Sequence, residues 1–216
     1  MYLDFHTHKI KKHAIYSVIV GEEMKSVPQT CFSAGIHPWY ITNKLQQMEI
    51  LELLLKQNKC LFVGECGLDK LKGEDLQIQQ ELFIRQIKLS EQYQKPMVLH
   101  CVKAYNEVIQ LHKQIQPLQT WVIHGFNKGK ELANQLVDRM IYLSFCMDLF
   151  NSGARRKALA EVPLNQLFLE TDENETHTIQ ELYALASEIL NISVQELKTQ
   201  IESNLWRITG WNEQNC

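Results

Sequence analysis

The stretch that decides the fold is residues 60–99. It begins with the apolar run CLFVG (60–64), continues with LQIQQELFIRQIKLSEQYQ (76–94) and ends with PMVL (96–99). The two short runs are nearly continuous and apolar, which is typical of strands buried on both faces of a parallel sheet. The segment between them has helical periodicity, and parallel strands need such a crossover connection. This stretch therefore predicts a strand, a helix and a second, parallel strand.

The same alternation extends along the whole chain. Eight short apolar runs are expected to be strands: YLDF (2–5), AIYSVIV (14–20), TCFSAGI (30–36), CLFVG (60–64), PMVL (96–99), TWVI (120–123), MIYLSF (140–145) and LFLE (167–170). Helical periodicity predicts helices near 45–57, 76–94, 104–115, 129–137, 153–161, 178–190 and 194–208. The chain is therefore expected to be built from repeated strand–helix units.

Eight such strands predict a (β/α)8 barrel of the TIM type, in one domain covering residues 1–216. Only about eight and nine residues separate the first three runs, which is too few for normal crossover helices. We therefore expect a compact, trimmed barrel whose first helices are short or missing. A doubly wound open sheet is the alternative, but no glycine-rich phosphate loop follows any of the predicted strands.

Composition limits the classes of function. The net charge of −3 provides no general field that would attract nucleic acid, so phosphate binding would require local basic groups. The sequence contains neither a signal-peptide pattern nor an apolar segment long enough to span a membrane. Six scattered cysteines without a CxxC pair favour reduced thiols, and with them a cytoplasmic location. No obligate protein partner is evident.

Polar residues that can bind metal stand at the ends of five predicted strands. They are His6, His8, Glu65, His100, His124 and Asp172. The carboxyl ends of barrel strands open on one face, so these side chains are expected to converge. Each alone is more commonly a hydrogen-bonded histidine or a loop carboxylate. Burying all six together without a cation would be too costly, and their types suit divalent transition ions. The set therefore predicts a metal site.

Six motifs carry a resemblance to a known family. They are DFHTH (4–8), AGIHPW (34–39), VGECGLD (63–69), VLH (98–100), VIHGF (122–126) and LETD (169–172). Their order and spacing are similar to the TatD-related DNase family of metal-dependent hydrolases, within the amidohydrolase-like barrels, over about residues 1–210. The resemblance implies a pair of divalent metal ions and hydrolysis of phosphodiester bonds, typically in DNA or oligonucleotides.

The resemblance also implies roles for individual residues. His6 and His8 would hold one metal, Glu65 would bridge both metals or bind the first, His100 and His124 would hold the second, and Asp172 would bind metal and water. Asp172 is the expected general base. Asp4 is expected either to orient the first histidine pair or to face out of the barrel. Four imidazoles favour Zn, Mn, Ni or Fe over Mg alone, although such sites accept several ions.

Residues around the predicted centre are expected to contact the substrate. His37 matches a family position near the substrate, where it would contact a phosphate oxygen. Trp39 and Tyr40 are expected either to stack on a base or only to cap the barrel. The family commonly has an arginine where this chain has Val102, so the neighbouring Lys103 is expected to provide a phosphate contact instead.

Other departures from the family make metal-dependent hydrolysis a firmer expectation than DNA as the substrate. Glu173 adds a negative charge beside Asp172, and the loop that follows is short. One alternative is the same metal barrel acting on a small amide, lactone or phosphoester. Glu65 stands where the related carbamylated enzymes have a lysine, which argues against that branch. An alternative of another class is a catalytically degenerate, metal-containing binding protein.

Overall fold

All eight predicted runs become strands of one parallel sheet, whose strand order follows the chain. The structure is a computed structural model that describes residues 1–21, 28–174 and 176–211. The strands are β1 (Asp4–Thr7), β2 (Ala14–Ile19), β3 (Phe32–Gly35), β4 (Cys60–Asp69), β5 (Met97–Val102), β6 (Trp121–Ile123), β7 (Tyr142–Phe145) and β8 (Leu167–Leu169). The sequence thus located every strand, and the ends of most differ by only one to three residues.

The sheet curves round until its last strand meets its first. Thr7 forms a parallel bridge with Asp172, and the Asp172 amide donates to the His6 carbonyl at 2.9 Å. This contact brings the segment after β8 against the end of β1. The predicted β/α barrel is confirmed.

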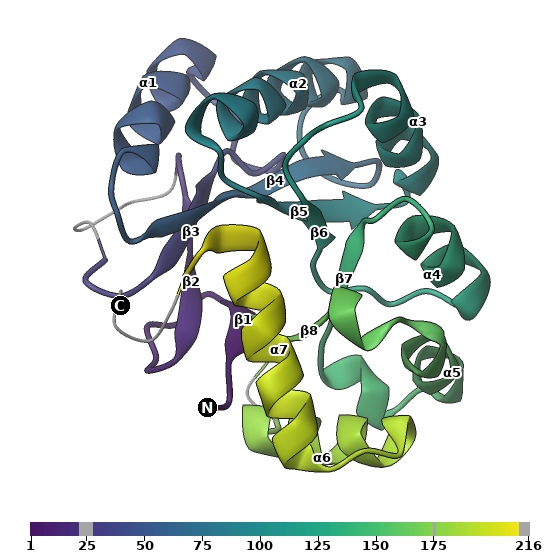
Figure 1. Ribbon diagram of the computed structural model, residues 1–216. Helices are drawn as coiled ribbons and strands as arrows, with labels where there is room; N and C mark the ends of the chain where they lie inside the picture. Colours follow the sequence, from purple (N-terminus) through teal and green to yellow (C-terminus); the bar gives the residue numbers. More distant parts are fainter. Residues whose placement is uncertain (22–27, 175, 212–216) are drawn as a thin grey trace.

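Helices surround the strands, as Figure 1 shows. They are α1 (Lys44–Leu55), α2 (Leu76–Tyr93), α3 (Tyr105–Ile115), α4 (Lys130–Val137), α5 (Gly153–Glu161), α6 (Ile179–Leu190) and α7 (Val194–Thr209), with short 3-10 turns η1 (Met147–Phe150) and η2 (Leu164–Gln166). The first helix follows β3. Residues 8–13 are not helical, nor are the described residues between β2 and β3. The barrel is therefore trimmed at its front, as predicted.

Aromatic side chains fill the barrel interior. The Phe5 ring on β1 lies 5.3 Å from that of Phe62 on β4 and 4.2 Å from that of Phe168 on β8, between ring centroids. Strands β1 and β4 are not neighbours in the sheet, so these rings meet across the interior. All three side chains are fully buried, and each such burial contributes about 1.5–3 kcal/mol. This packing makes the barrel a solid support for the residues at its mouth.

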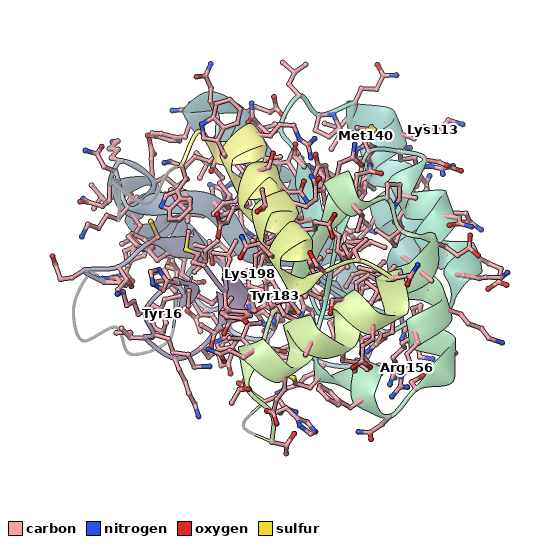
Figure 2. All side chains as sticks on the ribbon, turned by 60° about the horizontal axis from the view of Figure 1, so that its bottom comes forward. Tyr16, Lys113, Met140, Arg156, Tyr183 and Lys198 are labelled. Atoms are coloured by element: carbon pink, nitrogen blue, oxygen red, sulfur yellow. The ribbon has the colours of Figure 1, made fainter. Side chains whose placement is uncertain are left out.

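The last two helices hold the segment that leads into β1. On α6, the Tyr183 hydroxyl donates to the Leu3 carbonyl at 3.0 Å. On α7, the Lys198 ammonium lies 4.6 Å from the centroid of the Tyr2 ring; Figure 2 labels both Tyr183 and Lys198. Asn204 on α7 donates to the Leu167 carbonyl at 2.9 Å, which ties that helix to the start of β8. The C-terminal helices therefore join the two strands that close the barrel.

The cysteines depart in part from the expectation of reduced thiols. Cys60, Cys66, Cys101 and Cys146 are free, but Cys31 is disulfide-bonded. Sequence spacing alone does not indicate which distant cysteines meet in a fold, so this bond was missed. Cys216 lies outside the described residues. Within the described ranges, no helix has both the length and the apolar character needed to cross a membrane.

A glycine allows β4 and β5 to approach closely where Gly67 pairs with His100. Gly67 has a φ of 141°, and a Cβ built on it would lie 2.1 Å from the carbonyl oxygen of His100. An L-residue is strained at this φ, and the obstructing atom is backbone that cannot turn aside. Gly67 therefore sets how closely the strand carrying Glu65 lies to the strand carrying His100.

Replacement of Gly67 by alanine should destabilise the fold. We expect Gly67→Ala to lower the free energy of unfolding by about 2 kcal/mol or more, because backbone strain and overpacking add. Gly210→Ala is the matched control, since Gly210 also has a positive φ of 68° but a Cβ added there would meet no atom within 4 Å. The control should lose only about 1 kcal/mol. Equal losses in urea unfolding would contradict the close-approach argument.

Candidate metal centre

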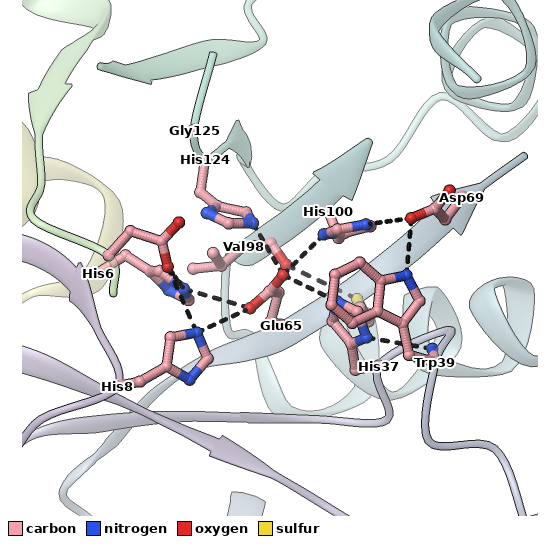
Figure 3. Close-up of polar contacts among 12 residues, drawn as sticks. His6, His8, His37, Trp39, Glu65, Asp69, Val98, His100, His124 and Gly125 are labelled. Carbon is pink, nitrogen blue, oxygen red and sulfur yellow. Dashed lines mark hydrogen bonds and ion pairs between the residues drawn. The ribbon is translucent and has the colours of Figure 1, made fainter. Parts of the chain in front are cut away.

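The ends of the strands bring the six predicted metal residues together at the mouth of the barrel. His6 lies on β1, Glu65 on β4 and His100 on β5, whereas His8 and His124 directly follow β1 and β6, and Asp172 comes three residues after the end of β8. Figure 3 shows the imidazoles arranged around the carboxylate of Glu65, to which dashed lines converge from both sides. The convergence expected from strand-end positions is therefore present in the fold.

One oxygen of Glu65 contacts three imidazoles. Glu65 Oε1 lies 2.9 Å from His100 Nδ1, 2.8 Å from His124 Nε2 and 3.0 Å from His37 Nε2. Burial favours the neutral form of this carboxyl, but the charge of His124 and the hydrogen bonds from the three histidines outweigh it. Together they hold the pKa of Glu65 well below its usual range. The carboxylate therefore stays ionised inside the protein.

The second oxygen of Glu65 faces the first histidine pair. Glu65 Oε2 lies 3.2 Å from His6 Nε2 and 3.6 Å from His8 Nε2. Asp172 Oδ1 lies across from the same two nitrogens, at 3.9 Å and 3.5 Å respectively. Glu65 consequently lies between the two sets of imidazoles.

These residues fit a divalent cation. Ligand atoms lie within 4.8 Å of one another in four groups: His6/Glu65/His124, His6/His8/Asp172, His37/Glu65/His100 and His124/Glu170/Asp172. Both ring nitrogens of His6 are buried and lack a partner in hydrogen-bond geometry among the described residues. A buried nitrogen without a partner is unfavourable, and a cation at the Nε2 side would satisfy it. Imidazole and carboxylate are also the donors that zinc and similar ions prefer.

The groups differ in one respect from the predicted pairing of His100 with His124. The rings of these two histidines are 5.9 Å apart between centroids, and no group contains both. His100 groups with His37, whereas His124 groups with His6 or with Asp172. His100 and His124 both contact Glu65, which supports the expectation that Glu65 joins two half-sites.

Glu170, absent from the predicted ligands, is buried beneath His124. Its Oε1 accepts from the Gly125 amide at 2.6 Å and lies 3.3 Å from His124 Nδ1. Burial opposes a charge on His124, but Glu65 and Glu170 outweigh it and raise the pKa of that histidine well above its usual value. Glu170 lies two residues before Asp172 in LETD, so the alternation of the strand was a signal that could have identified it.

Asp69 is a second residue that the prediction missed. Its Oδ2 lies 3.1 Å from His100 Nε2 and accepts from the Trp39 indole at 2.7 Å. Burial alone would raise the pKa of Asp69, but these hydrogen bonds and one from the Leu71 amide lower it. Asp69 lies four residues after Glu65 on the same strand, and even spacing would have indicated a shared face.

His37 is held as a hydrogen-bond donor. Its Nδ1 accepts from the backbone amide of Trp39 at 3.1 Å, so the neutral ring carries its proton on Nε2, which faces Glu65. Burial lowers the pKa of His37 and keeps the ring neutral. The side chain therefore presents an N–H to the centre and not a free lone pair.

The structure bears on two expectations about neighbouring residues that the sequence leaves open. Trp39 is 37% exposed, but the Lys72 ammonium lies 3.6 Å from the centroid of its ring, so a base would have to displace that lysine to stack there. Asp4 does not contact the histidine pair. It accepts from the amide and hydroxyl of Thr171, at 2.8 Å and 2.6 Å.

Charged residues of both signs surround the mouth. Lys103 is exposed just after β5, and it makes no direct contact with the six central residues in the part of the chain described. Burial together with the charges of Lys103 and Arg155 lowers the pKa of Lys128, so these three cations lie near one another. Glu173 is exposed, and its charge is one of the causes that raise the pKa of His8 against desolvation. The rim is thus basic beyond β5 to β7 and acidic after β8.

Comparison with known sequences identifies relatives along most of the chain. Residues 11–210 match the family described as TatD related DNase. The "Uncharacterized metal-dependent hydrolase YcfH" of Escherichia coli is 27% identical over 206 residues, covering 88% of this chain and 76% of that protein. Another similar protein, the "Uncharacterized metal-dependent hydrolase YjjV" of the same species, is 31% identical over 145 residues, which cover 64% of this chain and 56% of the relative.

Solved structures have the same architecture. The crystal structure of the TatD homologue YjjV from Escherichia coli superposes with a TM-score of 0.81 at 20% identity, covering 97% of this chain and 98% of that one. An amidohydrolase from Saccharomyces cerevisiae gives a TM-score of 0.76 at 12% identity, over 95% and 99% of the two chains. At these identities the likeness concerns the fold alone. With its barrel, its strand-end histidines and a family match over residues 11–210, the chain belongs to the TatD related DNase family.

Proposed function

We propose that this protein is a metal-dependent hydrolase that cleaves phosphodiester bonds in DNA or oligonucleotides. The observation that carries the proposal is the buried, ionised Glu65, whose two oxygens lie within 3.6 Å of five imidazoles. A purely structural core has no use for so many ionisable groups around one carboxylate, whereas a metal centre requires them. The family description and the metal-dependent hydrolases among the relatives point in the same direction.

Two divalent cations would be held in two half-sites. His6, His8 and Asp172 would hold one, His100 and His124 the other, and Glu65 would contact both. Bound there, the cations would supply the charge that lowers the pKa of an attacking water and stabilises the attacking and leaving oxygens. The identity of the metal stays a prediction, with Zn, Mn, Ni and Fe ahead of Mg on ligand type.

The chain's own side chains would handle the proton and the substrate. Asp172 and His8 are the open members of the centre, with 33% and 23% of their side chains exposed, so water reaches the site from their side. Asp172 would accept the proton of the attacking water as general base. His37 would contact a non-bridging phosphate oxygen by sharing its Nε2–H, since that hydrogen already faces Glu65 and the other ring nitrogen accepts from the Trp39 amide.

A polyanionic substrate is supported by the basic side of the rim. Lys103 would replace the arginine that the family commonly has at Val102, and Lys128 lies near it. Glu173 opposes this attraction, which favours short oligonucleotides or strand ends over long duplexes. We also expect a cytoplasmic location and a single domain over residues 1–216, both of which stay predictions.

Metal content is the first test. Elemental analysis of protein purified without added metal should find up to two divalent ions per chain, and incubation with zinc or manganese should raise a partial content to two. Removal with a chelator should abolish hydrolysis in a panel that contains single- and double-stranded DNA, a generic phosphodiester, esters and amides. A protein that binds no divalent ion would refute the proposal. If the protein cleaves only the small esters, amides or phosphodiester, one of these classes and not DNA is its substrate.

The role of Asp172 can be tested by one isosteric change. Asp172→Asn should lower kcat about 10²–10⁴-fold, because the amide cannot accept the proton from water. Metal content measured alongside separates loss of the base from loss of metal. Asp138→Asn is the control, because that carboxylate is exposed at the end of α4. Undiminished DNA cleavage by Asp172→Asn would disprove its assignment as the base.

Lys103 should affect substrate binding more than turnover. We expect Lys103→Gln to raise KM for an oligonucleotide several-fold and to reduce the dependence of KM on salt, since one phosphate contact is removed. Lys113→Gln serves as the control, because Lys113, labelled in Figure 2, lies in the last turn of α3 and lines a pocket with Trp121 at the start of β6, not at its carboxyl end. If both variants have the same KM as the wild type, phosphate binding by Lys103 is excluded.

A further inference from the structure

The carboxylate of Asp69 joins the wall of the site to one of its imidazoles. Its Oδ2 accepts from the Trp39 indole N–H at 2.7 Å and lies 3.1 Å from His100 Nε2 (Figure 3). On the other side of the same ring, His100 Nδ1 lies 2.9 Å from Glu65 Oε1. Trp39, Asp69, His100 and Glu65 therefore form a continuous chain of polar contacts that leads into the centre.

The hydrogen bonds around Asp69 determine which nitrogen of His100 carries a proton. Asp69 Oδ1 accepts from the amides of Leu71 and Lys72, at 2.7 Å and 3.1 Å. Backbone amides and the Trp39 indole can only donate, so Asp69 is an acceptor toward all of them. His100 Nε2 must then donate to Oδ2, so Nδ1, which faces Glu65, is the nitrogen left to bind a cation in place of a proton.

The position of Asp69 is fixed by the backbone as well as by its side chain. The Gln79 side-chain amide accepts from the Asp69 N–H at 2.8 Å and donates to the Asp69 carbonyl at 2.9 Å. Asp69 is only 3% exposed. The Trp39 ring contacts the Lys72 ammonium and, edge-to-face, the His100 ring, so turning it away would break both contacts. Asp69 can therefore hold His100 in one orientation.

We propose that Asp69, held by Trp39, is a positioning residue that fixes the tautomer and the orientation of His100 and thereby sets the cation affinity of its half-site. Neither residue touches the reacting atoms. A carboxylate that accepts from the distal N–H of an imidazole makes the other nitrogen more basic and pre-orients it for a cation. This inference rests on the proposed metal centre, and it assigns to Trp39 a function other than base stacking.

Zinc affinity in matched variants tests the proposal. In competition with a chromogenic chelator, Asp69→Asn should weaken zinc binding at one site about 10–100-fold, since its NH₂ group would face a donor in either orientation. Trp39→Phe, which keeps an aromatic ring but lacks the N–H, should weaken the same site less. Glu107→Gln is the control, because that carboxylate pairs with Lys70 at 2.5 Å, beside Asp69 in sequence. It should bind zinc like the wild type.

Nitrogen-15 NMR of the imidazoles reports which His100 nitrogen carries the proton, and this would not change if Asp69 had only a structural role. Zinc-loaded wild type should have the His100 proton on Nε2, and the metal-free protein should give a slowly exchanging Nε2–H signal. Asp69→Asn should lose both features while thermal unfolding shows it folded. Should that variant not fold, Trp39→Phe decides, through faster exchange of the same proton.

The outcomes separate this proposal from the proposed function. If Asp69→Asn binds zinc as tightly as the wild type does and its His100 tautomer is unchanged, the positioning role of Asp69 is overturned, whereas the proposed metal centre is unaffected. Absence of zinc binding by the wild type would instead refute the metal centre. Weakened zinc binding in Glu107→Gln as well would show a general effect of lost negative charge, and would likewise overturn the assignment to Asp69.

Discussion

A carboxylate with almost no exposure to water, that of Glu65, organises the mouth of the barrel. An ionised group in such a place is strongly unfavourable unless nearby groups compensate its charge. Five imidazoles, carried on or just after β1, β3, β5 and β6, provide that compensation, and four of them are the histidines of the two proposed half-sites. The ionised state of Glu65 on β4 therefore depends on the positions of these four strands.

The second layer of contacts makes this arrangement rigid. Asp69 holds the far nitrogen of His100, and Glu170 holds that of His124, so each ring is bound from behind by a carboxylate. Such partners fix the orientation of a ligand and increase its basicity. His37 is held differently, by a backbone amide that leaves its N–H facing the centre. Two imidazoles are thus set to accept a cation, and the third to donate a hydrogen bond.

The centre is closed on one side and open on the other. The side chains from β4 and β5 are buried, while Asp172 and His8 beside β1 and β8 keep a quarter to a third of their surface exposed. Strands β1 and β8 meet where the barrel closes, and residues 8–13 after β1 form no helix. The solvent-facing side of the centre is therefore the side that carries Asp172 and His8.

The sequence alone determined the barrel and the six residues at its mouth. Buried parallel strands have a local signature, and polar residues at their carboxyl ends converge in any such barrel, so no long-range information was needed. Only the tertiary structure decided the partners of those residues. Asp69 and His100 are 31 residues apart, Glu170 and His124 are 46 apart, and Asp4 binds Thr171 across 167 residues. The disulfide of Cys31 and the lysine over Trp39 were equally invisible, because contacts between distant segments depend on register and packing, which periodicity does not encode.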